Sequence, residues 1–108
     1  MNILVVEPAK LFRELIGQIA SVAGAHVETA SSGEEGLEAL KKKHFDLYCV
    51  AYHLGDMDSS EFITKTKQNP LNPNIVSVLI TANSDELREK SLSKGFTEIF
   101  DKNNIIFF

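Results

Sequence analysis

Apolar residues are concentrated in five short runs along the chain, and longer segments of mixed polarity separate these runs. Each run has the length of a strand and is bounded by glycine, proline or polar residues. Runs of this kind are typical of strands, and the nearly uninterrupted ones are typical of strands buried on both faces of a parallel sheet. The expected strands are residues 3–6, 25–30, 47–51, 75–81 and 96–101.

The segment after the first strand has the spacing of an amphipathic helix. Proline is tolerated in a first helical turn, so the helix can begin at Pro8, and Gly24 ends it in the usual C-terminal manner. Its apolar residues recur at helical spacing and predict one buried face, made of Leu11, Phe12, Leu15, Ile16, Ile19 and Val22.

The remaining connections also predict helices. Serines and glutamates in residues 31–35 form overlapping capping boxes for a helix that ends at lysines 41–43. Residues 60–68 form a short helix with Phe62 and Ile63 as its apolar contacts. A last helix begins after Asn83 or Ser84, has Asp85 and Glu86 in its first turn, and ends at Gly95.

Strands and helices therefore alternate as βαβαβαβαβ along a chain of 108 residues. This alternation predicts a doubly wound α/β fold with a parallel sheet, helices on both faces and right-handed crossovers. The length fits one domain, residues 1–108. We expect this domain to be the N-terminal part of a longer signalling protein, for the reasons given below. A fifth helix after the last strand is missing, unless residues 105–108 begin it.

Composition narrows the class of function. The formal net charge is −4, which argues against nucleic-acid binding, and the basic run at residues 41–43 sits where cations favour a helix C-terminus. The single cysteine, Cys49, falls inside a buried strand and behaves as a small hydrophobe. Neither a signal peptide nor a membrane-spanning stretch is present, which predicts a cytoplasmic protein without a membrane partner.

The stretch from Asp46 to Ser59 organises the candidate site. It consists of the third strand, residues 47–51, followed by a Gly/Asp loop. In open α/β sheets the chemistry lies just past the carboxyl ends of the strands. The residue that ends this central strand is Ala51, whose methyl group carries no chemistry.

The chain resembles the receiver domain of two-component response regulators along essentially all of its length. No single motif is specific, but their joint order and spacing is. The matching segments are residues 3–7, the Gly24, Val27, Ala30 and Gly33 spacing, residues 46–47, 55–58 and 80–82, and Gly95 with Lys102. The resemblance implies a five-stranded flavodoxin-like fold with strand order 2-1-3-4-5.

The resemblance also implies a site, which this chain retains only in part. The family uses an aspartate at the end of the third strand as phosphoacceptor, an acidic pair after the first strand for Mg²⁺, and a Thr or Ser and a Lys for the phosphoryl oxygens. Of these, Glu7, Thr81 and Lys102 are retained. The altered positions are Ala51 at the acceptor, Pro8 in the acidic pair, Ile99 at the aromatic switch and Asn103 after the lysine.

These departures predict a degenerate receiver that is not an enzyme. A methyl group cannot form an acyl phosphate, and Glu7 alone is a poor Mg²⁺ site, so we expect metal binding to be lost or weak and no other cofactor. An engineered Asp→Ala change would explain Ala51 alone. The further changes at Pro8, Ile99 and Asn103 favour natural divergence.

Three functional hypotheses follow. The first is a phosphorylation-independent protein–protein interaction module, which can form a homodimer through the helix at residues 83–95 and the fifth strand. Complementary charges are available there from Lys90, Lys94, Glu98 and Asp101, and without a fifth helix Phe96 or Phe100 would be left open to a partner. The second is a working receiver with a displaced acceptor, Asp56 or Asp58, although turn and capping chemistry explains both residues. The third is a flavodoxin-like phosphate or nucleotide binder, which the sequence Glu7-Pro8-Ala9-Lys10 disfavours because it lacks free N–H groups.

Two smaller expectations can be compared with the structure. His26, His44 and His53 lack metal-ligand spacing, so we expect them to be structural or solvent-facing. Lys102 and Glu7 leave the carboxyl ends of strands that the inferred order brings to one cavity. We therefore expect them to form an ion pair in place of the lost aspartate network.

Overall fold

The computed structural model describes residues 1–69, 71–72, 74–82, 88–89 and 92–103. These residues form a sheet of five strands in the order β2-β1-β3-β4-β5, and every neighbouring pair is parallel. Both the predicted order and the predicted parallel pairing are confirmed. The strands are β1 (Asn2–Val6), β2 (His26–Ala30), β3 (Leu47–Ala51), β4 (Val76–Thr81) and β5 (Glu98–Asp101).

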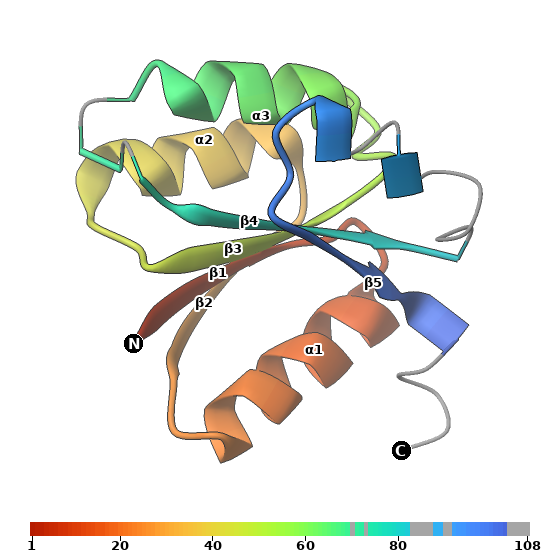
Figure 1. Ribbon diagram of the computed structural model, residues 1–108. Coiled ribbons are helices and arrows are strands. Elements are labelled where there is room, and N and C mark those ends of the chain that lie inside the picture. The colour runs from red at the N-terminus through yellow and green to blue at the C-terminus, as the bar shows by residue number, and fades with distance from the viewer. Residues whose placement is uncertain (70, 73, 83–87, 90–91, 104–108) are drawn as a thin grey trace.

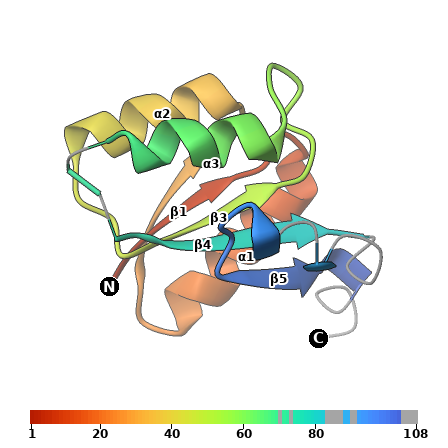
Figure 2. The ribbon, with the colours of Figure 1, turned by 45° about the horizontal axis from the view of Figure 1, so that its top comes forward.

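In the described part of the chain, three helices of nine or more residues cover the two faces of the sheet (Figure 1). Helix α1 (Lys10–Val22) lies on one face, whereas α2 (Gly33–Lys42) and α3 (Ser59–Lys67) lie side by side on the other (Figure 2). Most of the helix expected at residues 83–95 lies outside the described residues, as do residues 104–108, where a fifth helix would begin. No helix in the described part of the chain is long and apolar enough to cross a membrane.

Each face of the sheet has its own hydrophobic core. The α2–α3 side is the larger and includes Tyr48, Phe62 and Leu79. The α1 side is built around Val5, Ile16 and Ile80. Strand β1 contributes to both sides because successive side chains of a strand point to opposite faces. The prediction that the central strands are buried on both faces is therefore correct.

The predicted caps of α2 and α3 form, with small shifts in their boundaries. Ser32 caps α2 by accepting a hydrogen bond from the Glu35 amide at 3.1 Å. The Glu35 carboxylate in return accepts from the Ser31 amide at 2.7 Å and from its hydroxyl, so the return bond of the expected capping box is made to the residue before the cap. These bonds to Ser31 lower the pKa of Glu35. Helix α2 ends at Lys42, inside the basic run, as expected.

The predicted start of α1 is wrong by two residues. The helix begins at Lys10, with Ala9 as its cap residue, rather than at Pro8. The reason lies in the preceding turn: the Glu7 carboxylate accepts the Ala9 amide hydrogen at 2.9 Å, which fixes an extended residue before the helix. The first helical bond is then made by the Arg13 amide to the Ala9 carbonyl.

The predicted buried face of α1 is also wrong at its margin. Leu11 and Val22 are 66% and 81% exposed, and Ile19 is exposed as well, whereas Ile16 and Gly17 face the sheet. Gly17 lies over β2 with room for a methyl group, since an added Cβ would lie 3.6 Å from Val27. The helix is thus turned so that part of its apolar stripe points away from the sheet.

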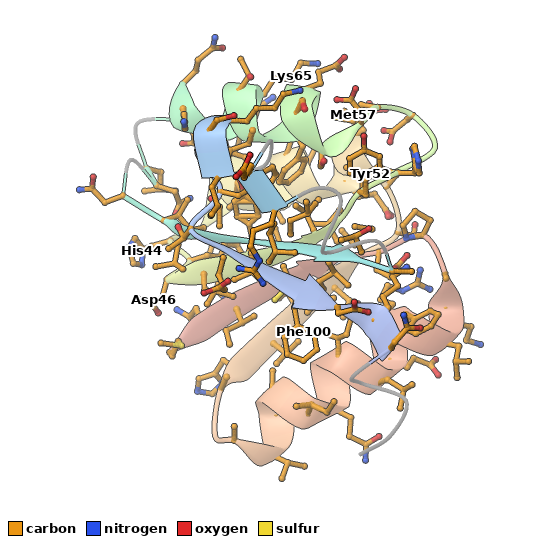
Figure 3. All side chains as sticks on the ribbon, turned by 45° about the vertical axis from the view of Figure 1, so that its right-hand side comes forward. His44, Asp46, Tyr52, Met57, Lys65 and Phe100 are labelled. Atoms are coloured by element: carbon orange, nitrogen blue, oxygen red, sulfur yellow. The ribbon has the colours of Figure 1, made fainter. Side chains whose placement is uncertain are left out.

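An apolar groove of about 260 Å³ borders this uncovered flank of α1. Its walls come from α1 and from strands β1, β3, β4 and β5, and include Ile19, Cys49, Val78 and Phe100. Figure 3 shows Phe100 on the α1 side of β5. The sequence suggested that Phe96 or Phe100 would be left open, and this is correct only for Phe100, since Phe96 is buried in the other core.

Candidate functional site

Four strand ends meet at the carboxyl edge of the sheet. Strands β1 and β3 are paired up to Val6 and Val50, and β3 and β4 up to Ala51 and Ile80. In β4 and β5 the last pair is Thr81 with Asp101. The residues that end or follow these strands are Glu7, Ala51, Thr81 and Lys102, so the structure brings together the positions that the sequence singled out.

Glu7 and Lys102 form the ion pair expected from the sequence. The Lys102 Nζ atom lies 2.5 Å from Oε1 of Glu7. The Glu7 side chain is 2% exposed and the Lys102 side chain 21%, so the carboxylate is buried and the ammonium reaches toward solvent. Among the described residues, no donor makes a hydrogen bond of regular geometry to Oε1, so the Lys102 ammonium is the group that compensates its charge. A buried carboxylate requires such compensation.

Phe12 provides a second contact for the ammonium group. The Lys102 Nζ atom lies 4.6 Å from the centre of the Phe12 ring, within the range of a cation–π interaction. Arg13, the next residue, donates to the backbone carbonyls of Glu7 at 3.0 Å and Pro8 at 3.3 Å. The sequence assigned Phe12 only to the apolar face of a helix and gave no signal for either contact.

The acceptor position is apolar. Ala51 is 2% exposed and belongs to the large core on the α2–α3 side. Pro8 is exposed and has no side-chain oxygen to offer. Among the described residues, no three His, Cys, Asp or Glu side chains lie close enough together to hold a metal ion.

The other positions implied by the resemblance lie around β4 and β5. Thr81 is buried at the end of β4, beside the strand that leads to Lys102. Ile99 is buried in the α2–α3 core. Asn103 is exposed, and its amide donates to the Asp101 carboxylate at 2.8 Å.

The two aspartates after β3 are both bound to helix N-termini. Asp58 caps α3 by accepting from the Glu61 amide at 2.8 Å, which confirms its expected capping role. The Asp56 carboxylate reaches across to α2, where it accepts from the Gly33 and Glu34 amides, each at 2.9 Å. These bonds, the one from Glu34 foremost, lower the pKa of Asp56. The contact with α2 was missed because it joins residues far apart in the sequence.

The remaining candidate side chains are dispersed. His26, His44 and His53 are all exposed, which confirms that they face solvent. Figure 3 shows His44 and Asp46 at one end of the sheet, and Tyr52 and Met57 at the other. Cys49 lines the apolar groove, and burial raises the pKa of its thiol to about 11.

The strand order and the helices on both faces of the sheet define a doubly wound α/β domain. Comparison with known families shows to which family it belongs. The sequence pattern of the response regulator receiver domain matches residues 3–105. The chain therefore belongs to the receiver domain family.

The most similar curated proteins include two that are much longer than this chain. A cyclic di-GMP phosphodiesterase of Thermotoga maritima is 30% identical over 94% of the chain, and the sensor histidine kinase RcsC of Escherichia coli is 26% identical over 94%. The matched segment makes up 27% of the first protein and 11% of the second. The chain thus spans a minor part of both relatives.

Solved structures agree on the fold. A CheY-like receiver domain protein of Methanospirillum hungatei has a TM-score of 0.82 at 26% identity, covering 94% of this chain and 80% of that one. The chemotaxis protein CheY4 of Vibrio cholerae has a TM-score of 0.85 at 24% identity, covering 94% and 85%.

Proposed function

We propose that this domain is a degenerate receiver that acts in two-component signalling as a phosphorylation-independent protein–protein interaction module. The observation that carries the proposal is Ala51 at the end of β3, buried and without a carboxylate. Acyl-phosphate formation needs a carboxylate nucleophile, and a methyl group offers none. The domain is accordingly a binding module and not an enzyme.

The Glu7–Lys102 ion pair supports the same conclusion. In the receiver mechanism implied by the resemblance, the lysine binds phosphoryl oxygens and the acidic residue binds Mg²⁺. Here each engages the other at 2.5 Å. Metal or phosphate binding would have to break this contact, in which the carboxylate is buried. Glu7 is also a poor Mg²⁺ site by itself, because Pro8 and Ala51 contribute no side-chain oxygen.

The displaced-acceptor alternative is disfavoured by the contacts of the two aspartates. Asp58 is occupied as the cap of α3, and both oxygens of Asp56 accept amides of α2. Phosphorylation of either carboxylate would have to disturb these bonds. The phosphate-binding alternative is disfavoured as well, because the Ala9 amide after β1 already donates to Glu7 and Pro8 has no N–H group.

The partner is a protein or an output domain of the signalling protein to which the domain belongs. Both curated relatives extend far beyond the segment matched here, which supports a modular arrangement. We place the function in the cytoplasm, without nucleic acid or membrane as a direct partner of this domain.

Phosphoryl uptake is the decisive test. The domain should be incubated with acetyl phosphate and Mg²⁺ beside a phosphorylatable receiver as positive control, and its intact mass measured. We expect no gain in mass for this domain and a gain of one phosphoryl group for the control. A stoichiometric gain would overturn the proposal. Repeating the reaction with Asp56→Asn and Asp58→Asn would then show which displaced acceptor is used.

A further inference from the structure

The loop between β3 and α3, residues 52–58, is a closed turn. His53 and Asp58 form an antiparallel bridge, and the Leu54 amide donates to the Met57 carbonyl at 3.1 Å. Gly55 has a φ of 87°, a left-handed conformation that glycine adopts without strain. The turn therefore has its own internal hydrogen bonds and a defined shape.

This turn is attached to α2 by a pair of hydrogen bonds. The two oxygens of Asp56 accept from consecutive amides of α2, Oδ1 from Gly33 and Oδ2 from Glu34, each at 2.9 Å. First-turn amides have no partner within their own helix, and a negative charge at this end is favoured by the helix dipole. The contact connects a loop and a helix that are more than twenty residues apart in the sequence.

Packing reinforces the attachment. A Cβ atom added to Gly33 would lie 2.6 Å from both Cγ and Sδ of Met57, so the thioether occupies the space that a side chain at position 33 would take. Leu54 of the turn is buried in the same core as Ala51. The turn is thus held by a carboxylate, a methionine and a leucine at neighbouring points.

We propose that Asp56 couples the N-terminal turn of α2 to the loop beside the candidate site. The two hydrogen bonds of its carboxylate to α2 fix the position of the loop after Ala51. Loss of these bonds therefore loosens the loop at the carboxyl edge of the sheet as well as the first turn of α2. The proposal does not depend on whether phosphoryl uptake is lost.

Amide hydrogen exchange on the whole chain tests this coupling residue by residue. In Asp56→Ala we expect protection of the Gly33 and Glu34 amides to fall by about tenfold or more, the change expected from losing hydrogen bonds to a charged acceptor. The Leu54 amide, which bonds within the turn and not to Asp56, should lose protection by a similar factor. Asp58→Ala is the matched control, since it removes a cap from α3 and should affect the Glu61 amide first.

Two further variants make the test specific. Gly33→Ala displaces Met57 but leaves Asp56 in place, and it should expose the Leu54 amide in the same way. Asp56→Asn retains one acceptor oxygen and should give an intermediate effect. If Asp56→Ala and Asp56→Asn alter only the Gly33 and Glu34 amides while Leu54 keeps its protection, Asp56 is a local helix cap and the proposed coupling is wrong. Unchanged protection at all three amides would also overturn it.

Discussion

The buried carboxylate of Glu7 is at the centre of three linked contacts. Its Oε2 atom accepts the Ala9 amide, its Oε1 atom meets the Lys102 ammonium, and the ammonium in turn lies over the Phe12 ring. Removing either charge leaves the other without its partner, and the cost is larger for the more buried one. The pair is therefore asymmetric: loss of Lys102 strands a carboxylate that is 2% exposed, whereas loss of Glu7 leaves a lysine that can still reach water.

We predict that Glu7→Gln lowers the free energy of unfolding by about 2–3 kcal/mol, somewhat below the cost for a fully buried pair because Lys102 is partly exposed. Lys102→Met should cost more, and the double variant less than the sum of the two. Denaturant unfolding of the four proteins gives the coupling energy. The control is Glu61→Gln, which breaks an exposed ion pair with Lys65 of 3.1 Å and should cost below about 1 kcal/mol. Equal losses for Glu7→Gln and Glu61→Gln would show that burial does not matter.

The same contacts show which residues sequence reasoning can place. Glu7 and Lys102 were predictable because each directly follows a strand and parallel strands bring their carboxyl ends to one edge. The contacts of Phe12 with Lys102 and of Asp56 with α2 were not predictable. They depend on how a helix is rotated and where a loop turns, and neither leaves a periodic signal in the sequence.

At the scale of elements, the helices differ in how tightly they approach the sheet. An added Cβ at Gly36 of α2 would lie 2.8 Å from Val6 and 3.0 Å from Phe62. At Gly17 of α1 it would make ordinary contacts of 3.6 and 3.7 Å with β2. Helix α2 is thus packed to the limit at this point, whereas α1 has room for a methyl group.

We therefore predict opposite signs for the same substitution in two helices. Gly17→Ala should raise the free energy of unfolding by about 0.5–1 kcal/mol, because alanine is the better helix former and the methyl group fits. Gly36→Ala should lower it by about 1–3 kcal/mol through overpacking, despite the same gain in propensity. Denaturation midpoints of the two variants give the answer directly. Stabilisation by both would mean that Val6 and Phe62 yield easily.

The helical periodicity of the sequence correctly predicts α1 but overestimates how much of its apolar face is buried. The apolar positions from Leu11 to Val22 form one stripe, yet a helix on a sheet buries only the part that touches it. The covered part lies around Ile16 and Gly17, which are buried against the sheet, whereas Leu11, Ile19 and Val22 are exposed. Periodicity alone contains no information on this rotation.

At the scale of the whole molecule, the sheet has two edge strands of different character. Strand β2 is polar and largely exposed, with Glu28 in a 3.8 Å ion pair with Lys43. At the other edge, Glu98 of β5 lies 3.5 Å from Arg88, and Phe100 is 40% exposed. Lys94, one of the charges expected to serve a dimer interface at this edge, donates to Ser60 at 2.8 Å, while Lys90 lies outside the described residues.

We predict that two copies associate through the β5 edge and the preceding helical segment, in line with the interaction role proposed above. The edge combines exposed apolar surface at Phe100 with charges of both signs, Glu98 and Arg88, that can pair with a second copy as they pair within one chain. Sedimentation should show a dimer that weakens as salt is raised, since exposed charge pairs are screened.

Charge reversal at the two edges separates this interface from general charge effects. Glu98→Lys should weaken the dimer by about tenfold or more, because it places like charges beside Arg88 and across the interface. Glu28→Lys makes the same change in net charge at the β2 edge, beside Lys43, and should leave the dimer constant unchanged. A monomer at every concentration would contradict self-association. Equal weakening by both variants would instead indicate that net charge, and not the β5 edge, governs it.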